Sequence, residues 1–408
     1  MIPPRSFAAV RDELDRRRRV TLGFERIEAL LGLLGNPERD LRVVQVVGTN
    51  GKGTTAVALA GALEEAGYSS GTYLSPHLLS YTERVMIGGR FVSEELFAAG
   101  MDEAIRISDD GGVPASQFEL LTAGALKTFA DAGLSWAVLE AGLGARHDAT
   151  TAAAPEAVVL TNVGLDHAEY LGDTVEEIAL EKLGGLAPGG TLVLGTDDAG
   201  TLEVARGECA RIGARLVEAH QRGEPVPGLP AYAAHNARVG IRAAEALLGR
   251  TVGDAARSRV VRGVAGLLPA RFEEHEVRGV PVIVDGGHNV PGLKAALEAT
   301  RNAYGGGPLG VVFGALRDKD IGSMLSALRQ EADALALTRP ASERAAEPAW
   351  VVREYGPRDR GGRLARVTND AGDALDTLVE EMKALGGVVL VTGSLYTGAS
   401  ILGGLREG

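Results

Sequence analysis

The chain has 408 residues, which is more than a single hydrophobic core usually supports, so we expect two or three domains. Its composition, with 45% hydrophobic and 24% charged residues, is that of a globular protein. A net charge of −12 argues against a broad surface for nucleic acid or anionic membranes, and the single cysteine, Cys209, excludes an internal disulfide framework and a cysteine-rich zinc site.

The N-terminal segment, MIPPRSFAAVRDELDRRRRV, is expected to form a helix and not a targeting signal. It lacks the apolar stretch of a signal peptide, and nowhere does the chain hold a run of apolar residues long enough to span a membrane. Together with the lone cysteine, these features favour a cytoplasmic protein. The four arginines at 16–19 could form a nucleic-acid patch, but a solvated helix face is the simpler interpretation.

From about residue 41, short β-rich runs alternate with longer helical patterns, which is typical of parallel sheets covered by helices. A Pro- and Gly-rich stretch at 221–230, a helix near 234–248 and a connector at 266–279 separate two such series, so we expect two α/β domains. The segment 197–230 is too weakly patterned to support a prediction. The expected strands are 41–47, 70–74, 136–142, 157–163 and 191–196 in the first series, and 280–286, 309–316, 332–338, 350–355 and 387–393 in the second.

The first strand runs into the stretch VVGTNGKGTT (46–55), which resembles a phosphate loop with altered spacing. In the usual G-x-x-x-x-G-K-[ST] form a hydroxyl follows the lysine, whereas here the first glycine is two residues too close and Gly53 follows Lys52. The order of strand, glycine loop and helix still directs backbone amides, the helix dipole and Lys52 at an anion. An ordinary glycine-rich turn is the alternative interpretation.

Polar residues also follow the next expected strands: Ser75 after 70–74, Glu140 near the end of 136–142, and His167 shortly after 157–163. Ligands bind outside the carboxyl ends of strands in open parallel sheets, so we expect these side chains at one edge together with Lys52 and Thr54. Hydroxyl and carboxylate oxygens beside a phosphate loop suit Mg²⁺, with His167 as a less usual ligand.

The second series has polar strand ends of its own. Asp285 and His288 follow one expected strand, Lys319 follows another and Ser394 a third, so we expect all four near one edge, with ordinary βα loops as the alternative. Lys182 lies on a helix beyond His167, and its position alone favours a surface lysine.

Taken in order, these blocks resemble the folylpolyglutamate synthase/dihydrofolate synthase family, a branch of the Mur-ligase superfamily. They span nearly the whole chain, from about residue 22 to 397. The blocks are LGFERIEALLGLLGNP, VVGTNGKGTT, YLSPHL, FELLTAGAL, VLEAGLGARHDAT, TNVGLDHAEYLGDTVEEIALEK, LPARFE, DGGHNVPG, FGALRDKD and TGSLY.

The resemblance implies an N-terminal domain of the P-loop ATPase type with a mostly parallel sheet at 1–272, a linker at 273–277 and a Rossmann-like α/β domain at 278–408. It also implies an ATP-dependent amide ligase. ATP phosphorylates a folate-type carboxylate, the amine of L-glutamate attacks the acyl phosphate, and ADP and phosphate are released. The partners implied are small molecules only, namely ATP, L-glutamate and folate or dihydropteroate, without nucleic acid or membrane, and the protein is expected to be a monomer.

The resemblance assigns roles to residues that match the family's motifs. Lys52, Glu140, His167 and Lys182 are the catalytic set, and Mg²⁺ is bound by Ser75, Glu140, His167 and a carbamylated Lys182, with K⁺ as a further cofactor. Nucleotide contacts are Asn50, Gly51, Lys52, Gly53, Thr54, Asn236, Arg271, Asp285 and His288. Substrate contacts are Phe118 and Asp148 on the pterin side and Lys319 and Ser394 on the glutamate side.

The chain departs from the family where a His-Gln pair usually precedes the helix asparagine, because here the stretch is YAAHN at 232–236. Contacts from that pair to adenine are therefore in doubt, with His235 as a substitute. Smaller departures are Ala145, His147, Ala270 and Gly287.

Two other functions remain open at this point. A cell-wall Mur ligase acting on another carboxylate would carry a UDP-binding domain, for which the segment before Gly48 is too short. A nucleotide-binding module without chemistry would be expected to lack Lys52, Glu140 or His167, and all three are present. The sequence does not distinguish dihydropteroate from tetrahydrofolate as acceptor, or an enzyme that uses both.

Overall fold

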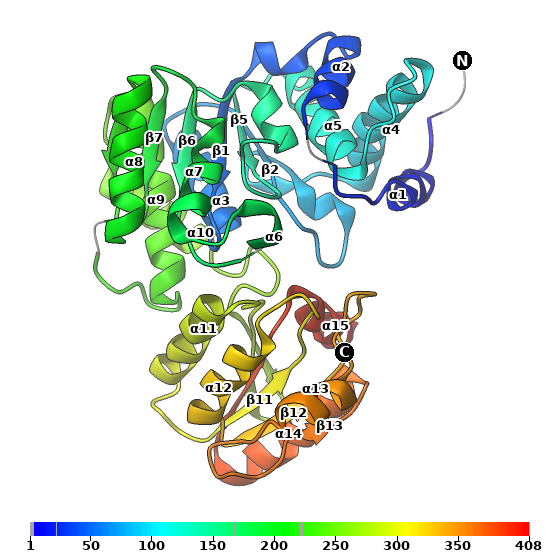
Figure 1. The fold of residues 1–408 in the computed structure, drawn as a ribbon, viewed down its shortest axis with the longest axis vertical. Coiled ribbons are helices and arrows are strands. Elements are labelled where there is room, and N and C mark those ends of the chain that lie inside the picture. The colour runs from blue at the N-terminus through cyan, green and yellow to red at the C-terminus, as the bar shows by residue number, and fades with distance from the viewer. Residues whose placement is uncertain (1–3, 22, 167, 221–222, 408) are drawn as a thin grey trace. The chain divides into compact units, whose positions relative to one another are not determined.

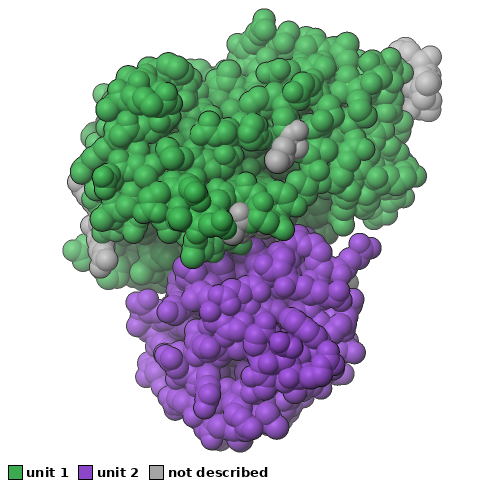
Figure 2. Space-filling model, in the orientation of Figure 1, with its two compact units in different colours: residues 1–265 green, residues 266–408 purple. Residues whose placement is uncertain are grey.

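The computed structural model describes residues 4–21, 23–166, 168–220 and 223–407 (Figure 1). The chain divides into two compact units, Met1–Ala265 and Gly266–Gly408, which Figure 2 shows in different colours. Each unit is an α/β body with its own sheet, as expected from the alternation of strand and helix patterns.

Within the described residues, the first unit contains an eight-stranded sheet in the order β4-β3-β2-β5-β1-β6-β7-β8. The strands from β2 to β8 along this order pair in parallel, and β3 and β4 add an antiparallel edge. All five strands expected in this part of the chain are present, whereas β3, β4 and β8 were not predicted because they are short or polar. The bounds are β1 (Arg42–Val47), β2 (Ser70–Tyr73), β3 (Val85–Ile87), β4 (Arg90–Phe91), β5 (Trp136–Glu140), β6 (Ala157–Leu160), β7 (Thr191–Leu194) and β8 (Arg215–Glu218).

The central strands β1, β5 and β6 are apolar and almost fully buried, because helices cover both faces of a parallel sheet. A capping box formed by Thr174 and Glu177 starts α7. The helices of this unit are α1 (Phe7–Arg16), α2 (Glu25–Leu33), α3 (Lys52–Glu65), α4 (Glu94–Asp110), α5 (Gln117–Asp131), α6 (Ala168–Leu171), α7 (Val175–Lys182), α8 (Ala199–Ile212), α9 (Ala231–Leu248) and α10 (Asp254–Gly263).

The second unit, as described, is built on a six-stranded sheet in the order β13-β12-β11-β14-β10-β9, in which only β9 is antiparallel to its neighbour. The expectation of two mostly parallel α/β domains is therefore confirmed. The elements are β9 (Glu273–Val277), β10 (Val280–Val284), α11 (Val290–Ala303), β11 (Leu309–Phe313), α12 (Ile321–Glu331), β12 (Ala334–Leu337), α13 (Pro348–Tyr355), β13 (Arg366–Val367), α14 (Ala371–Leu385), β14 (Val388–Thr392) and α15 (Leu395–Glu407).

The prediction of a strand at 350–355 is wrong, because these residues lie in helix α13. Pro348 occupies the first turn, where its missing N–H costs nothing, and the buried residues Pro348 and Val351 are three apart on one face. Gly356 ends the helix in the left-handed conformation. The apolar run at 350–352 matches a strand and a helix equally well, and the flanking Pro and Gly decide between them.

The expected linker at 273–277 is strand β9, which pairs with β10 from Val277 opposite Val280 to Glu273 opposite Val284. Arg278 and Gly279 both have positive φ, 51° and 81°, as a two-residue hairpin turn requires. Acidic residues dominate β9, and this edge strand was therefore not recognised as part of a sheet.

Candidate active site

Strands β2, β5, β1 and β6 are neighbours in the sheet and run in parallel, so their carboxyl ends meet at one edge. The segments that leave these ends carry Ser75 after β2, Glu140 as the last residue of β5, and the loop 48–51 after β1. The expectation that these residues share one edge of the sheet is confirmed. Their order along the edge follows the strand order, with the loop between Glu140 and the residues after β6.

Two glycines of the loop 48–51 have backbone conformations and surroundings that exclude a side chain. Gly48 has a φ of 144°, and a Cβ there would lie 1.9 Å from Oγ1 of Thr161. Gly51 has a φ of 81°, and a Cβ there would lie 2.3 Å from Nδ2 of Asn236. Gly48 and Gly51 are therefore required by close approach of neighbouring groups as well as by backbone geometry.

The loop is fastened to the chain that follows β6. The backbone oxygen of Asn50 accepts hydrogen bonds from Thr161 Oγ1 at 2.7 Å and Asn162 Nδ2 at 3.0 Å, and Asn50 N donates to Asn162 Oδ1 at 3.0 Å. Gly164 N donates to Thr49 Oγ1 at 3.0 Å. Thr161 and Asn162 were not predicted as site residues. Their only sequence signal is their place directly after a strand of the same sheet.

Lys52 begins helix α3, directly after the loop. Its Nζ donates to the carbonyl oxygens of Gly48 at 3.2 Å and Thr49 at 3.4 Å, so the ammonium lies over the loop. Gly53 and Thr54 follow in the first turn, where backbone N–H groups have no partner within the helix. The loop, the helix N-terminus and Lys52 together form an anion-binding site of the kind found in nucleotide-binding proteins.

Glu140 and Ser75 are in direct contact. The backbone N–H of Ser75 donates to Oε2 of Glu140 at 2.9 Å, and the Glu140 side chain is buried at the end of β5. This bond holds a carboxylate beside a serine hydroxyl at the edge that carries the loop. His167, the third ligand expected here, lies outside the described residues.

Lys182 is buried, which contradicts the surface position that its place on a helix favoured. Its Nζ donates to the carbonyl oxygen of Gly48 at 3.1 Å, the same oxygen that accepts from Lys52. Burial, and then the nearby charge of Lys52, lower the pKa of Lys182 to about 7. Near neutral pH a large share of this amine is therefore uncharged, unlike an exposed lysine.

Asp148 is also buried and holds the turn that follows β5. Its Oδ2 accepts from the N–H groups of Gly142 at 2.9 Å and Leu143 at 3.0 Å, and its Oδ1 accepts from Thr150 N at 2.9 Å and Thr150 Oγ1 at 2.5 Å. Burial raises the pKa of Asp148 in spite of these donors. Phe118, partly exposed on α5, packs against Gly142, so both residues expected on the pterin side contact the turn that follows β5.

Asn236 reaches the phosphate loop from α9. Its side chain lies against Gly51, and its backbone oxygen accepts from Thr55 Oγ1 at 3.2 Å. The asparagine is buried. Among the predicted nucleotide contacts in the described part of the first unit, Asn236 is the only one that touches the loop from a distant part of the sequence.

In the second unit, β10, β14 and β11 are adjacent and parallel, so the polar residues that follow them share an edge. Asp285, after β10, accepts from Phe272 N at 3.0 Å and Gly287 N at 2.9 Å. The bond to Phe272 fixes the backbone next to Arg271, where Ala270 and Phe272 have positive φ values of 52° and 53°. Asp285 therefore positions the Arg271 segment in addition to any role in binding.

The remaining predicted residues of this unit differ in accessibility. Nδ1 of His288 lies 3.0 Å from the carbonyl oxygen of Gly286, and Lys319 is partly exposed after β11. Ser394 is almost completely buried, and its hydroxyl oxygen accepts from Thr397 N at 3.0 Å and lies 2.9 Å from Thr397 Oγ1. The Ser394 hydroxyl therefore makes its hydrogen bonds to Thr397, within the fold.

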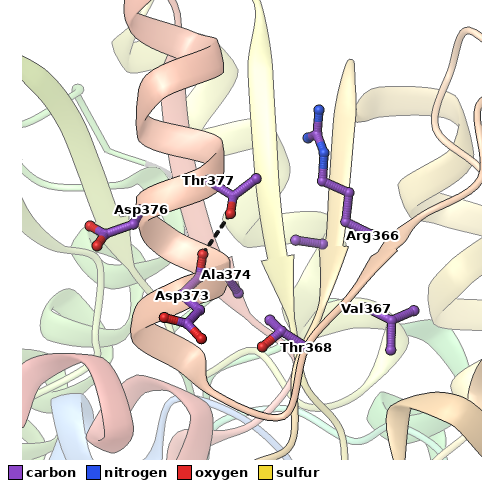
Figure 3. Close-up of a pocket in the computed structure, with 8 residues that line it drawn as sticks. Arg366, Val367, Thr368, Asp373, Ala374, Asp376 and Thr377 are labelled. Atoms are coloured by element: carbon purple, nitrogen blue, oxygen red, sulfur yellow. Dashed lines mark hydrogen bonds between the residues drawn. The ribbon is translucent and has the colours of Figure 1, made fainter.

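The second unit also has a surface pocket of about 460 Å³ between β12, β13 and α14 (Figure 3). None of the predicted site residues lines it. Two of its polar side chains have partners at the protein surface. Thr377 Oγ1 donates a hydrogen bond to the Asp373 carbonyl oxygen, and Asp376 forms an ion pair with Arg278 at 3.0 Å. The lining residues are Ala336, Arg366, Val367, Thr368, Asp373, Ala374, Asp376 and Thr377.

Across the described ranges, no cluster of three or more His, Cys, Asp or Glu side chains is arranged as a preformed metal site. The same ranges contain no helix with the length and apolarity needed to cross a membrane. At the edge of the first sheet, the chemistry available is an anion-binding loop with Lys52 beside the oxygen donors of Glu140 and Ser75. Such a set can bind phosphates together with a divalent cation.

Two models of known protein families match the chain. The Mur ligase middle domain matches residues 46–213, and the glutamate ligase domain of Mur ligases matches residues 270–395. A dihydrofolate synthase/folylpolyglutamate synthase of Bacillus subtilis is 30% identical over 415 residues, which cover 92% of this chain and 93% of the relative.

Solved structures agree with this result. The folylpolyglutamate synthase of Mycobacterium tuberculosis complexed with ADP matches with a TM-score of 0.86 and 28% identity, over 98% of both chains. A bifunctional folylpolyglutamate synthase/dihydrofolate synthase of Yersinia pestis, complexed with AMPPNP and Mn ion, matches with a TM-score of 0.83 and 28% identity, over the full length of both chains.

Proposed function

The chain belongs to the folylpolyglutamate synthase/dihydrofolate synthase family of Mur ligases, and we propose that it is an ATP-dependent ligase that joins L-glutamate to a folate-type carboxylate. ATP transfers its terminal phosphoryl group to the carboxylate, and the amine of L-glutamate attacks the acyl phosphate. The C–N bond forms as the C–O bond to phosphate breaks, which releases phosphate. A carboxylate is a poor electrophile, and phosphorylation supplies the leaving group.

The observation that carries this proposal is the edge of the first sheet, where the phosphate loop, Lys52, Glu140 and Ser75 come together. In phosphoryl transfer the protein mainly positions the reactants and stabilises charge, and this edge offers the means for both. Gly51, Gly53 and Thr54 present backbone N–H groups to the ATP phosphates. Lys52, held over the loop carbonyls in the free protein, then turns to the phosphates as a positive charge.

The residues at this edge fit a magnesium ion. Glu140 and Ser75 provide the oxygen donors that Mg²⁺ prefers, and His167 and Lys182 complete the ligand set in this proposal. A relative with AMPPNP and Mn ion bound supports the use of a divalent cation. When bound, the ion would neutralise charge on the phosphates during transfer. Glu140 would hold the ion in place, because its own side chain is fixed by the bond from the backbone of Ser75.

Lys182 fits this ligand set only after carbamylation, because an ammonium repels a cation. The pKa near 7 keeps part of the amine neutral, and a neutral amine attacks CO₂. The N–C bond forms, one C–O π bond of CO₂ becomes a carboxylate, and a proton leaves the nitrogen. The product is an anionic oxygen donor next to Gly48. We include K⁺ as a further cofactor, to be tested by replacing it with Na⁺ in the activity assay.

The acceptor is proposed to bind near Phe118 and Asp148, with the ring of Phe118 against the pterin. Asp148 contributes by fixing the backbone of the turn at 142–150. The names of the Bacillus and Yersinia relatives include both synthase activities, which supports dihydropteroate and tetrahydrofolate as alternative acceptors. A glutamate-ligation assay that compares the two acceptors distinguishes a single from a dual activity.

The second unit is proposed to add nucleotide contacts through Arg271, Asp285 and His288, and glutamate contacts through Lys319 and Ser394. Their shared sheet edge supports this assignment. Because these residues belong to a different unit from the phosphate loop, closure of the two domains is expected to be part of the reaction. An ATP complex in which none of them approaches the nucleotide would contradict this part.

The central test is phosphate release from ATP by the full chain, which we propose acts as a monomer. Release that requires both L-glutamate and a pteroate or folate supports the ligase. Release that is indifferent to both, or that requires a different carboxylate, contradicts it. Light scattering of the same preparation measures the oligomeric state.

A further inference from the structure

Gln45 is a polar residue inside β1, the strand that leads directly into the phosphate loop. It is completely buried, and its neighbours Val44 and Val46 are the apolar residues expected in a central strand. Its side-chain nitrogen donates to Oγ1 of Thr150 at 2.8 Å and to Oγ1 of Thr151 at 2.7 Å. Gln45 therefore connects β1 to the segment that follows β5.

The two threonine hydroxyls extend this connection to the turn itself. Thr150 Oγ1 donates to Oδ1 of Asp148 at 2.5 Å, and Thr151 Oγ1 donates to the carbonyl oxygen of Ala145 at 2.7 Å. Because each hydroxyl proton is used in this way, each hydroxyl oxygen is left as an acceptor. A neutral side chain with two N–H donors on one nitrogen serves both oxygens, and only Gln and Asn have such a group.

The oxygen of the same amide has a less favourable environment. Oε1 of Gln45 is buried and has no hydrogen-bond partner among the residues that the structure describes. A Cβ on Gly185 would lie 2.1 Å from this oxygen, so the segment after Lys182 closes over the amide. A buried oxygen without a donor is destabilising, and an apolar residue in the strand would avoid that penalty. The two N–H donors are therefore what distinguishes Gln45 from an apolar residue here.

We infer that Gln45 is a positioning residue that fixes the acceptor-side turn relative to the phosphate loop. This inference rests on the proposed function. Asp148, where the chain of hydrogen bonds ends, accepts from the N–H groups of Gly142 and Leu143. Phe118, on the proposed acceptor side, packs against Gly142. An acceptor carboxylate must lie in line with the transferred phosphoryl group, and a displacement of about 1 Å costs roughly 10²-fold in rate.

The first experiment compares the parent with Gln45→Leu, which keeps most of the bulk of the side chain and removes both donors. In glutamate ligation by the full chain, kcat/KM for the acceptor should fall by roughly 10- to 100-fold. The Kd of ADP, measured by calorimetry with Mg²⁺, should stay parental. Parental acceptor kinetics, or an equal loss of ADP affinity, would overturn the inference.

Thr128→Val is the matched control for the loss of a buried hydrogen bond in the same unit. Thr128 is buried on α5, and its Oγ1 donates to the carbonyl oxygen of Gly124 at 2.8 Å, within that helix. This variant should keep the parental acceptor kinetics. If it loses as much acceptor kcat/KM as Gln45→Leu, the effect is one of general stability and the inference is wrong.

The second experiment tests whether Gln45 acts through Thr150, and it also serves if Gln45→Leu does not fold. Thr150→Val removes the hydroxyl that joins Gln45 to Asp148 and should lower acceptor kcat/KM, whereas Thr150→Ser keeps the hydroxyl and should restore it. The double variant Gln45→Leu with Thr150→Val should lose less than the product of the two single losses. A loss equal to that product, or a Thr150→Ser variant as poor as Thr150→Val, contradicts the path.

Hydrogen exchange at the N–H groups of Gly142 and Leu143 separates this inference from the proposed function, because it needs no substrate. In Gln45→Leu both should exchange faster by on the order of tenfold, the effect of about one buried hydrogen bond, while amides in the centre of α4 keep parental rates. This result in a protein without glutamate-dependent activity contradicts the proposed function alone. Unchanged exchange, or an equal rise in α4, contradicts the inference.

Discussion

Replacing Gly51 with alanine tests whether the phosphate loop depends on its contact with α9. The added Cβ would lie 2.3 Å from Nδ2, 2.5 Å from Cγ and 2.6 Å from Oδ1 of Asn236. Ordinary carbon contacts are about 3.5 Å, so the buried asparagine or the loop must retreat by about 1 Å. The φ of 81° at Gly51 adds about 1–2 kcal/mol of backbone strain for any residue with a Cβ.

We expect Gly51→Ala to lower the free energy of unfolding by about 2–4 kcal/mol, from strain and overpacking together. A misplacement of about 1 Å at a reacting site costs roughly 10²-fold, so kcat/KM for ATP should fall by about that factor. Denaturant unfolding and glutamate-dependent phosphate release measure the two quantities.

Gly67→Ala is the matched control. Gly67 also has a positive φ, 90°, but a Cβ there meets no atom within 4 Å. It should lose about 1–2 kcal/mol of stability and keep the parental kcat/KM. In the double variant Gly51→Ala with Asn236→Ala, the collision is removed, so stability should recover relative to Gly51→Ala although activity does not. The reasoning is refuted if Gly51→Ala matches Gly67→Ala in both stability and activity.

Four further predictions concern three buried residues of the first unit, Glu140, Lys182 and Asp148. Glu140→Gln keeps the shape of the side chain but loses the anionic oxygen, so magnesium-dependent turnover should disappear while circular dichroism stays parental, and a near-normal kcat would contradict its role as a ligand. Lys182→Ala should be inactive and partly rescued by short carboxylates, whereas an active, rescue-independent variant would contradict carbamylation. In CO₂-free buffer at pH 6, Lys182→Met should have a free energy of unfolding higher than that of the parent by on the order of 4 kcal/mol, because charged Lys182 is penalised in the folded state. This gain should fade as the pH rises from about 7 towards 10.5, the range in which the folded amine is neutral and the unfolded amine is still charged. A pH-independent difference would contradict the lowered pKa of Lys182. Asp148→Asn loses an acceptor for buried N–H donors and should lower the free energy of unfolding by about 1–3 kcal/mol in urea titrations, and an unchanged stability would show that the turn does not depend on the carboxylate.

Much of the fold was predictable because its signals are local. Buried parallel strands are short runs rich in β-forming residues, and all five in the first series were found from such runs. Elements with weaker local signals were missed, as in the acidic edge strand β9, or mistaken, as in α13, where an apolar run of three residues fits either type of element.

The sequence by itself determined the class of fold, the motif of strand, loop and helix, and membership of the ligase family, since these depend on the order of residues along the chain. Only the tertiary structure decided which distant groups meet. Asn236 lies against Gly51 although 185 positions, 236 minus 51, separate them. Lys182 is buried next to Lys52, and this proximity with burial, not its helix pattern, sets its pKa. Periodicity predicts which face of an element is apolar, whereas contact and desolvation depend on how the elements pack.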